Sequence, residues 1–148
     1  MKKVLIYLCL MPLLVLVACD KEGLGDNYNF DNKVAPYVAF SSTAAVDAKE
    51  GATVVVPLTV RTAIQEELTI TLSLSGAINR EQTVVLPRGV LTVNSSITIP
   101  AGTIVSPATS ATVTVALTKA VSSGGTEFTI GRLANPETQK KVLNITLP

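Results

Sequence analysis

Strict alternation between aliphatic and hydroxyl side chains is the feature that most constrains the fold of this chain. In residues 68–75, Leu or Ile takes every second position, and Thr or Ser fills the others. Successive side chains of a β-strand point to opposite faces, so this segment has one apolar face and one hydroxyl face. The same period of two recurs in residues 112–118. The sequence therefore predicts strands that bury one face against a core.

Seven such segments occur along the chain, and turns rich in Gly, Pro or Ser separate them. No segment has a convincing helical period, although residues 134–140 could form one turn. Short strands with one apolar face, about ten residues apart, are typical of antiparallel sandwiches, whereas parallel strands are buried on both faces. The sequence predicts an all-β, antiparallel, two-sheet, immunoglobulin-like β-sandwich over residues 35–148. Its expected strands are 38–42, 54–61, 68–75, 82–86, 96–99, 112–118 and 142–147.

The alternation also assigns core residues in the less regular strands. Pro57 lies inside the strand expected at 54–61, and the side where its N–H is missing is expected to face an edge or a bulge. About twenty inward aliphatic side chains, each contributing roughly 1.5–3 kcal/mol, make a core of adequate size. Outside residues 68–75 and 112–118, the side chains predicted to point inward are Val38, Phe40, Val54, Val56, Leu58, Val60, Leu143, Ile145 and Leu147.

The first 18 residues have a different composition. Lys2 and Lys3 precede an apolar run over residues 4–18, which is shorter than the roughly 20 residues that span a bilayer. Such a run is typical of a signal peptide over residues 1–18. It ends in Leu16-Val17-Ala18-Cys19, which resembles the bacterial lipobox. The alternative is an ordinary secretory signal followed by an incidental cysteine.

The resemblance to a lipobox implies cleavage between Ala18 and Cys19 and acylation of Cys19, with palmitate among its acyl chains. Cys9 lacks a small residue before it and is expected to leave with the signal peptide. Each buried CH₂ contributes about 0.8 kcal/mol and one chain anchors only marginally, so two or three chains are expected to hold the protein on a membrane. The mature chain then has no free thiol and no disulfide.

Residues 19–34 are polar and aperiodic, which predicts a flexible tether on the lipid. The segment Asp20-Lys21-Glu22 resembles the acidic export signals of Bacteroidota surface lipoproteins. That resemblance implies an outer-membrane, surface-exposed location. Two alternatives stay open: any tether is polar, and in enterobacteria an Asp after the lipidated Cys favours inner-membrane retention.

Composition excludes several classes of function. The chain has no His and no Trp, and its net charge is +1. A nucleic-acid partner is not expected, because nucleic-acid binders carry a basic face. Without His there is no Ser-His-Asp or Cys-His catalytic apparatus and no imidazole metal ligand.

Several segments together resemble Calx-beta domains and the related domains of unknown function in Bacteroidota surface lipoproteins. The segments are Tyr37-Val38-Ala39-Phe40, residues 48–60 with their Glu50-Gly51 turn, Ile97 to Gly102, and the strand at 113–115. The resemblance covers about residues 35–120. It implies an immunoglobulin-like sandwich placed at the cell surface, often beside glycan-utilisation machinery, and it implies no reaction.

The same resemblance raises the question of calcium, which Calx-beta domains hold through acidic residues at one end of the sandwich. Glu50 matches one such residue and Asp47 is nearby, but Lys119 stands in the late strand where carboxylates are expected. Calcium takes six to eight oxygen ligands, several of them charged. No metal site and no cofactor are therefore predicted, and Asp47 and Glu50 are interpreted as solvated turn residues.

Catalysis has few candidates in this sequence. Glycosidase chemistry needs two carboxylates in one cleft, and Glu66, Glu67, Glu81 and Glu127 each neighbour a turn or a strand end, where charges are usually solvated. Residues 122–125, Ser-Ser-Gly-Gly, lack the lysine of a phosphate-binding loop and are interpreted as a flexible turn. The chain is therefore predicted not to be an enzyme.

Three functional interpretations stay open. The first is a non-catalytic surface lipoprotein that serves as an interaction or accessory module of a glycan-utilisation system. The second is a small carbohydrate-binding surface protein, and the third is a pilus-type subunit. Sugar rings commonly stack on aromatic faces, and Tyr28, Phe30 and Tyr37 are the candidate contacts for a glycan or a protein partner, whereas Phe40 is expected in the core.

Overall fold

The computed structural model describes residues 35–148. The predicted signal peptide (1–18) and tether (19–34) lie outside the described residues. No helix within 35–148 is long and apolar enough to cross a membrane. The strands are β1 (Tyr37–Phe40), β2 (Val46–Lys49), β3 (Thr53–Val60), β4 (Leu68–Gly76), β5 (Arg80–Leu86), β6 (Thr92–Thr98), β7 (Ser110–Ser122), β8 (Thr129–Ile130) and β9 (Lys140–Thr146). Two short 3-10 helices, η2 (Arg132–Ala134) and η3 (Pro136–Gln139), lie between β8 and β9.

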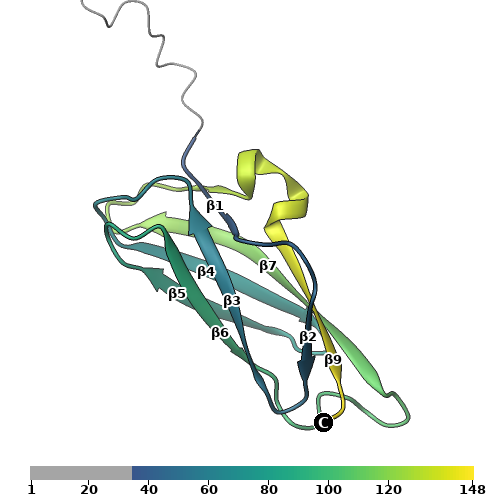
Figure 1. The fold of residues 1–148 in the computed structure, drawn as a ribbon. Coiled ribbons are helices and arrows are strands. Elements are labelled where there is room, and N and C mark those ends of the chain that lie inside the picture. The colour runs from purple at the N-terminus through teal and green to yellow at the C-terminus, as the bar shows by residue number, and fades with distance from the viewer. Residues whose placement is uncertain (1–34) are drawn as a thin grey trace, which may run out of the picture. The chain divides into compact units, whose positions relative to one another are not determined.

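The strands form two facing sheets (Figure 1). One sheet has the order β6-β3-β1-β8, and the other has the order β2-β9-β7-β4-β5. Neighbouring strands are antiparallel except in two short edge pairs, β1–β8 and β2–β9, which are parallel. The predicted all-β sandwich is confirmed. The seven predicted strands correspond to β1, β3 to β7 and β9, whereas β2 and β8 are additional.

The period of two places the core between the sheets. In β4 the four aliphatic side chains are 0–2% exposed, and the Thr and Ser side chains between them are half-buried or exposed. The predicted inward residues of β1 and β3 are likewise buried, and so are Leu143 and Ile145 of β9. Leu147 was predicted to point inward and is 45% exposed, because β9 ends at Thr146 and the alternation stops there.

A β-bulge shifts the alternation within β7. Thr71 of β4 pairs with Lys119, and the next residue, Leu72, pairs with Leu117, so Thr118 is the extra residue. The hydroxyl of Thr118 donates to the carbonyl oxygen of Thr71 at 3.2 Å. Thr118 and Lys119 are therefore both exposed, and burial resumes at Ala120. Lys119 lies inside β7 rather than at the end of a strand, because β7 continues to Ser122.

The chain crosses from one sheet to the other between β1 and β2, and a buried lysine holds this crossover. Lys141 of β9 is 3% exposed and lies on the same face as Leu143 and Ile145. Its Nζ donates to the carbonyl oxygens of Ser42 (2.9 Å) and Ala44 (2.7 Å). Burial lowers the pKa of Lys141, because desolvation disfavours the charged amine.

Side chains close one lateral edge of the sandwich, where β5 and β6 face each other from different sheets. The side chain of Gln82 donates to the carbonyl oxygen of Ser96 at 2.9 Å and to the hydroxyl of Ser95 at 3.2 Å. Arg80 donates to the carbonyl oxygen of Thr98 at 3.1 Å. β6 is an edge strand, so the outward carbonyls of Ser96 and Thr98 have no neighbouring strand in their own sheet. They accept hydrogen bonds from side chains of the opposite sheet instead.

Pro57 lies in β3, between β6 and β1. β3 itself is therefore an inner strand of its sheet. Its carbonyl accepts from the N–H of Ser41 at 3.0 Å, just after β1 ends at Phe40. In an antiparallel ladder the backbone N and O of one residue face the same neighbouring strand, so the nitrogen of Pro57 also faces the β1 side. Because β1 has ended at this level, the missing N–H of Pro57 costs the sheet no ladder hydrogen bond.

The loops gather at two opposite ends of the sandwich (Figure 1). We call the end that holds residue 36 and loops 61–67, 87–91 and 122–128 the Pro36 end. Backbone bonds join these loops: Thr129 to Pro36, Gly89 to Ile64 and Ser123 to Glu67. The opposite end holds residues 49–52, 99–109 and 147–148, and we call it the Pro148 end.

Candidate functional site

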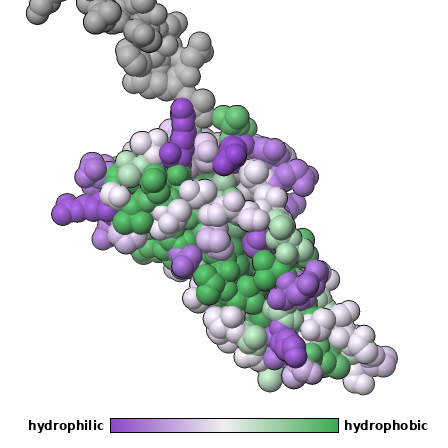
Figure 2. All heavy atoms as spheres, viewed as in Figure 1, coloured by the Kyte–Doolittle hydropathy of each residue, from purple (hydrophilic) through white to green (hydrophobic). Residues whose placement is uncertain are grey.

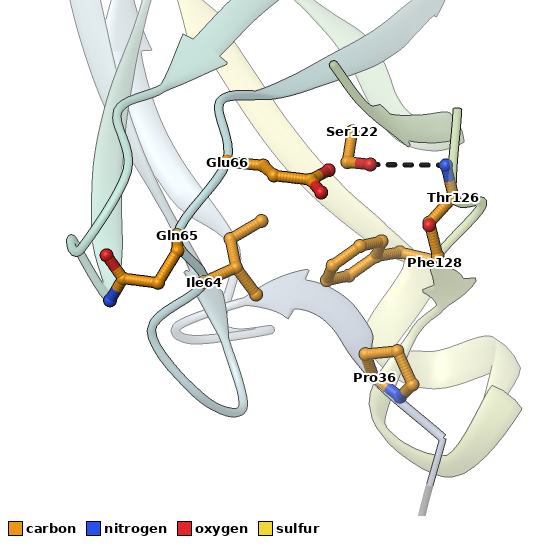
Figure 3. A pocket seen from close by; sticks show the side chains of 7 residues that line it. All are labelled: Pro36, Ile64, Gln65, Glu66, Ser122, Thr126 and Phe128. Atoms are coloured by element: carbon orange, nitrogen blue, oxygen red, sulfur yellow. Dashed lines mark hydrogen bonds between the residues drawn. The ribbon is translucent and has the colours of Figure 1, made fainter. Parts of the chain in front are cut away.

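A shallow pocket of about 270 Å³ opens at the Pro36 end. Phe128, Ile64 and Pro36 supply its apolar wall, and the ring of Phe128 points toward Ile64 (Figure 3). The side chain of Gln65 is turned away from Phe128 in the same view. The pocket therefore has an apolar floor with its polar groups along one side. Its lining residues are Pro36, Ile64, Gln65, Glu66, Ser122, Thr126 and Phe128.

Glu66 is the charged side chain among these lining residues, and the turn after β7 fixes its carboxylate. Gly124 N donates to Glu66 Oε2 at 3.1 Å. A hydrogen bond from Ser122 and this backbone bond lower the pKa of Glu66, and slight desolvation opposes them. The missing side chain of Gly124 makes the approach feasible, because a Cβ there would lie 2.8 Å from Oε2. The carboxylate is therefore ionised at neutral pH.

The Ser-Ser-Gly-Gly segment is a turn, as predicted, and a set of hydrogen bonds holds it. Gly125 N donates to Ser122 O at 2.9 Å, and Ser122 N donates to Thr126 O at 2.9 Å. The hydroxyl of Ser122 accepts from Thr126 N at 3.1 Å (Figure 3). The sequence did not predict that Ser122 pairs with Glu66, because the two segments are far apart in the chain and share no motif.

The structure places Asp47 and Glu50 in separate protein contacts. Asp47 Oδ1 accepts from the side-chain amide of Asn144 at 3.0 Å. Glu50 Oε1 accepts from the backbone N–H of Ile104 at 2.9 Å, which ties the β2–β3 turn to the loop before β7. Within residues 35–148, no group of three or more His, Cys, Asp or Glu side chains could hold a metal ion. Glu50 thus holds two loops together from its turn, whereas Asp47 was interpreted as a turn residue and lies instead within β2, where it bridges to β9.

The four carboxylates considered for catalysis do not share one cleft. Glu66 lines the pocket at the Pro36 end, and Glu67 and Glu127 are exposed nearby. Glu81 is exposed on β5, where it pairs with Ser73. In the part of the chain that the structure describes, no buried side-chain polar atom lacks a hydrogen-bond partner.

The aromatic residues are divided between the core and the edge. Phe40 is 4% exposed, as predicted, and Phe128 is 8% exposed. Tyr37 is half-buried in β1, where it pairs with Thr129 of β8. Tyr28 and Phe30 lie outside the described residues. Among the described strands no aromatic side chain is fully exposed, and Phe128 is the aromatic residue that lines the pocket.

Acidification is expected to release the turn after β7 from Glu66. The pKa of Glu66 is lowered below its ordinary value of 4.5. The contacts are therefore complete above pH 4.5 and are lost as pH falls through the folded-state pKa. The amide resonance of Gly124, followed by NMR, is expected to shift with a midpoint below 4.5. In Glu66→Gln this shift is expected to vanish, and an unchanged Gly124 titration in that variant would contradict the assignment.

Comparisons with known proteins bear on the fold. No protein family and no curated protein sequence matches this chain. Fourteen chains among the solved structures match it. One is the apo form of the Calx CBD1 domain, which is 12% identical, covers 77% of this chain and 98% of that chain, and superposes with a TM-score of 0.56. The chain therefore has a Calx-beta-like sandwich fold, as its motifs predicted, and at this identity the likeness shows the fold alone.

Proposed function

We propose that this chain is a lipid-anchored, non-catalytic interaction module at the outer-membrane surface, accessory to a glycan-utilisation system. The observation that carries the proposal is the tetrapeptide Leu16-Val17-Ala18-Cys19 at the end of the N-terminal apolar run. Acylation of Cys19 would supply the anchor. These residues lie outside the described residues, so the proposal rests on their sequence.

The arrangement of the domain supports an interaction role over a catalytic one. Glu50, Asp47 and Glu66 each make a hydrogen bond that fixes a loop or a neighbouring side chain. Glycoside hydrolysis requires two carboxylates facing one cleft, whereas the pocket at the Pro36 end is lined by one, Glu66. The last strand, β9, pairs with β2 and β7 of its own chain. This disfavours the pilus-type interpretation, in which a strand from another subunit completes the fold.

Removal of the acylated thiol tests the anchor directly. In cells, Cys19→Ala is expected to move the protein from the membrane fraction to the soluble fraction, because the unmodified chain loses all of its acyl chains. Cys9→Ala is the matched control and is expected to stay in the membrane fraction. Fractionation followed by immunoblotting measures both. Retention of Cys19→Ala in the membrane would show that the lipobox assignment is wrong.

A second candidate is a small carbohydrate-binding protein, and the pocket at the Pro36 end favours it. Glu66 and Ser122 offer polar atoms beside the ring of Phe128, and a volume of about 270 Å³ admits one sugar ring. A glycan array probed with residues 19–148 separates the candidates. Binding that is lost in Glu66→Gln would support the carbohydrate-binding protein, whereas a blank array supports the accessory module.

A further inference from the structure

The backbone groups of β3 face its two neighbours, β6 and β1, in alternation. Val60 N donates to Leu91 O, just before β6, and Pro57 O accepts from Ser41 N, just after β1. In an antiparallel ladder the backbone N and O of one residue face the same neighbouring strand. The pairing of β3 with β6 has no bulge. The even-numbered residues of β3 therefore face β6, and the odd-numbered residues face the β1 side.

β1 covers only part of that side of β3. Its last pair with β3 joins Phe40 to Leu58, and the chain then crosses to the other sheet, where β2 pairs with β9. In the part of the chain that the structure describes, no strand pairs with Thr53 or Val55 on the β1 side. Each of these two residues therefore offers a backbone N–H and C=O to a further strand. We call Thr53 and Val55 the open edge.

The side chains at the open edge also suit a further strand. β3 has the sequence TVVVPLTV and carries no charge, and β-branched residues such as Val and Thr favour strands. Val55 is 52% exposed on the outer face. Figure 2 shows a hydrophobic area in the middle of the viewed face, in the region where Figure 1 draws β3 and β2. An added strand would therefore cover apolar side-chain surface as well as backbone.

Three other edge strands carry features that oppose strand addition. Arg80 and Gln82 occupy carbonyl oxygens of β6. At β8, the side chain of Gln139 donates to the carbonyl oxygen of Ile130 at 3.0 Å. β2 carries the exposed charged residues of its sequence VDAK, and charged side chains discourage edge-to-edge pairing. The open edge of β3 differs from these edges because it is uncharged and no side chain bonds to its backbone in the described part of the chain.

A second folded copy of the domain fits the open edge poorly. Two copies could pair their β3 strands antiparallel about a twofold axis, with Thr53 opposite Val55. Gly51 of the second copy would then fall opposite Pro57, where Ser41 already lies. Shifting the register by two residues places Gly51 or Pro57 opposite the open edge, and both already bond within their own chain. A linear segment that ends or turns away beside Pro57 avoids these conflicts.

We propose that the open edge binds an extended segment of another protein, which adds a strand to β3, antiparallel to it and in line with β1. The inference deepens the proposed interaction role and rests on it. The two N–H and two C=O groups of Thr53 and Val55 would bond to the main chain of the segment, as in other cases of strand addition. An aromatic or β-branched side chain is expected opposite Val55, because such cross-strand pairs are stabilising.

Proline substitutions test which side of β3 is open. Val55→Pro removes an N–H at the open edge and leaves the β6 ladder intact, as Pro57 does two residues later. Val54→Pro is the matched comparison, because it removes an N–H that faces β6. Circular dichroism is expected to show that Val55→Pro keeps the fold and that Val54→Pro is unfolded or melts at a clearly lower temperature.

Hydrogen exchange in the wild type measures the open edge directly. The amides of Thr53 and Val55 are expected to exchange about tenfold or more faster than those of Val54 and Val56, which bond to β6. Equal protection of the four amides would overturn the proposal, because it would mean that this edge is already covered.

A displayed library of random linear heptapeptides is the probe for the partner. It is selected on residues 19–148 under reducing conditions, and each selected peptide is then measured on Val55→Pro. We expect β-branched or aromatic residues at alternate positions and a dissociation constant about tenfold higher for the variant, which lacks one main-chain donor. A library that yields no peptide sensitive to Val55→Pro would overturn the proposal. A wild-type dimer in ultracentrifugation that dissociates in Val55→Pro would also overturn it, in favour of a second copy.

These measurements use the soluble protein, so their result does not depend on the lipid anchor. Peptide binding that requires Val55, together with membrane retention of Cys19→Ala, would support strand addition and contradict the anchor. Release of Cys19→Ala from the membrane without such binding would support the anchor and overturn the open edge as the site of interaction.

Discussion

Gly76→Ala is expected to lower the free energy of unfolding by about 3–5 kcal/mol, because backbone conformation and packing both exclude a side chain there. Gly76 ends β4 with φ +103°, a conformation that residues with a Cβ rarely adopt. An added Cβ would lie 2.6 Å from the carbonyl oxygen of Thr112. That oxygen also accepts from Ala77 N at 3.1 Å. The substitution would therefore disturb the central β4–β7 pairing.

Gly102→Ala is the matched control for this prediction. Gly102 also has a positive φ, +81°, but a Cβ there meets nothing within 4 Å. Its expected cost is about 1–2 kcal/mol, from backbone strain alone. Urea unfolding followed by circular dichroism measures both variants. Equal losses of stability would show that the close approach of Thr112 to Gly76 is relieved at little cost.

Lys141→Ala is expected to lower the free energy of unfolding by about 2–4 kcal/mol, because the crossover between the sheets loses its two donors. The carbonyl oxygens of Ser42 and Ala44 both accept from Lys141 Nζ. The residues of this crossover are otherwise exposed and have no neighbouring strand. The amides of residues 43–47 are expected to exchange faster with solvent in the variant. Urea unfolding and hydrogen exchange measure these effects.

Lys141→Met separates the hydrogen bonds from the packing of the side chain. Met keeps an unbranched apolar stem but donates no hydrogen bond. The free energy of unfolding of Lys141→Met is therefore expected to lie between those of Lys141→Ala and the wild type.

The pKa of Lys141 is lowered in the folded state, so the free energy of unfolding of the wild type is expected to rise as pH increases from the folded-state pKa toward 10.5. Neither variant should show this alkaline gain. A gain of the same size in both would assign it to other groups.

The sequence predicted the sandwich because the period of two is directly visible wherever a strand buries one face. Leu68 to Leu74 alternate without a break, and the predicted core of β3 is buried in full. Strands with little apolar content escaped prediction: β2 contains Asp47 and Lys49, and β8 has two residues. Both lie at sheet edges and form through pairing with a neighbour rather than through a pattern of their own.

Residues that act over long distances in the chain could be predicted only in part. Lys141 lies two residues before Leu143 and four before Ile145, so the alternation places it on the same inward face of the strand. This pattern indicates a lysine that points inward, but the predicted strand began one residue later, at 142. The contact between Glu66 and Gly124 joins two loops through tertiary packing, and no local pattern encodes it. The bulge at Thr118 was also unforeseen, although the exposed pair Thr118-Lys119 interrupts the alternation.

The closed edge between β5 and β6 has a consequence for behaviour at high protein density. Unpaired strand edges are templates on which neighbouring molecules add strands and aggregate. Here the side chains of Arg80 and Gln82 occupy the carbonyls of Thr98 and Ser96 that such a strand would need. A strand added to β6 from a neighbouring copy would have to displace these two side chains. This arrangement opposes strand addition along β6 between crowded copies of the domain.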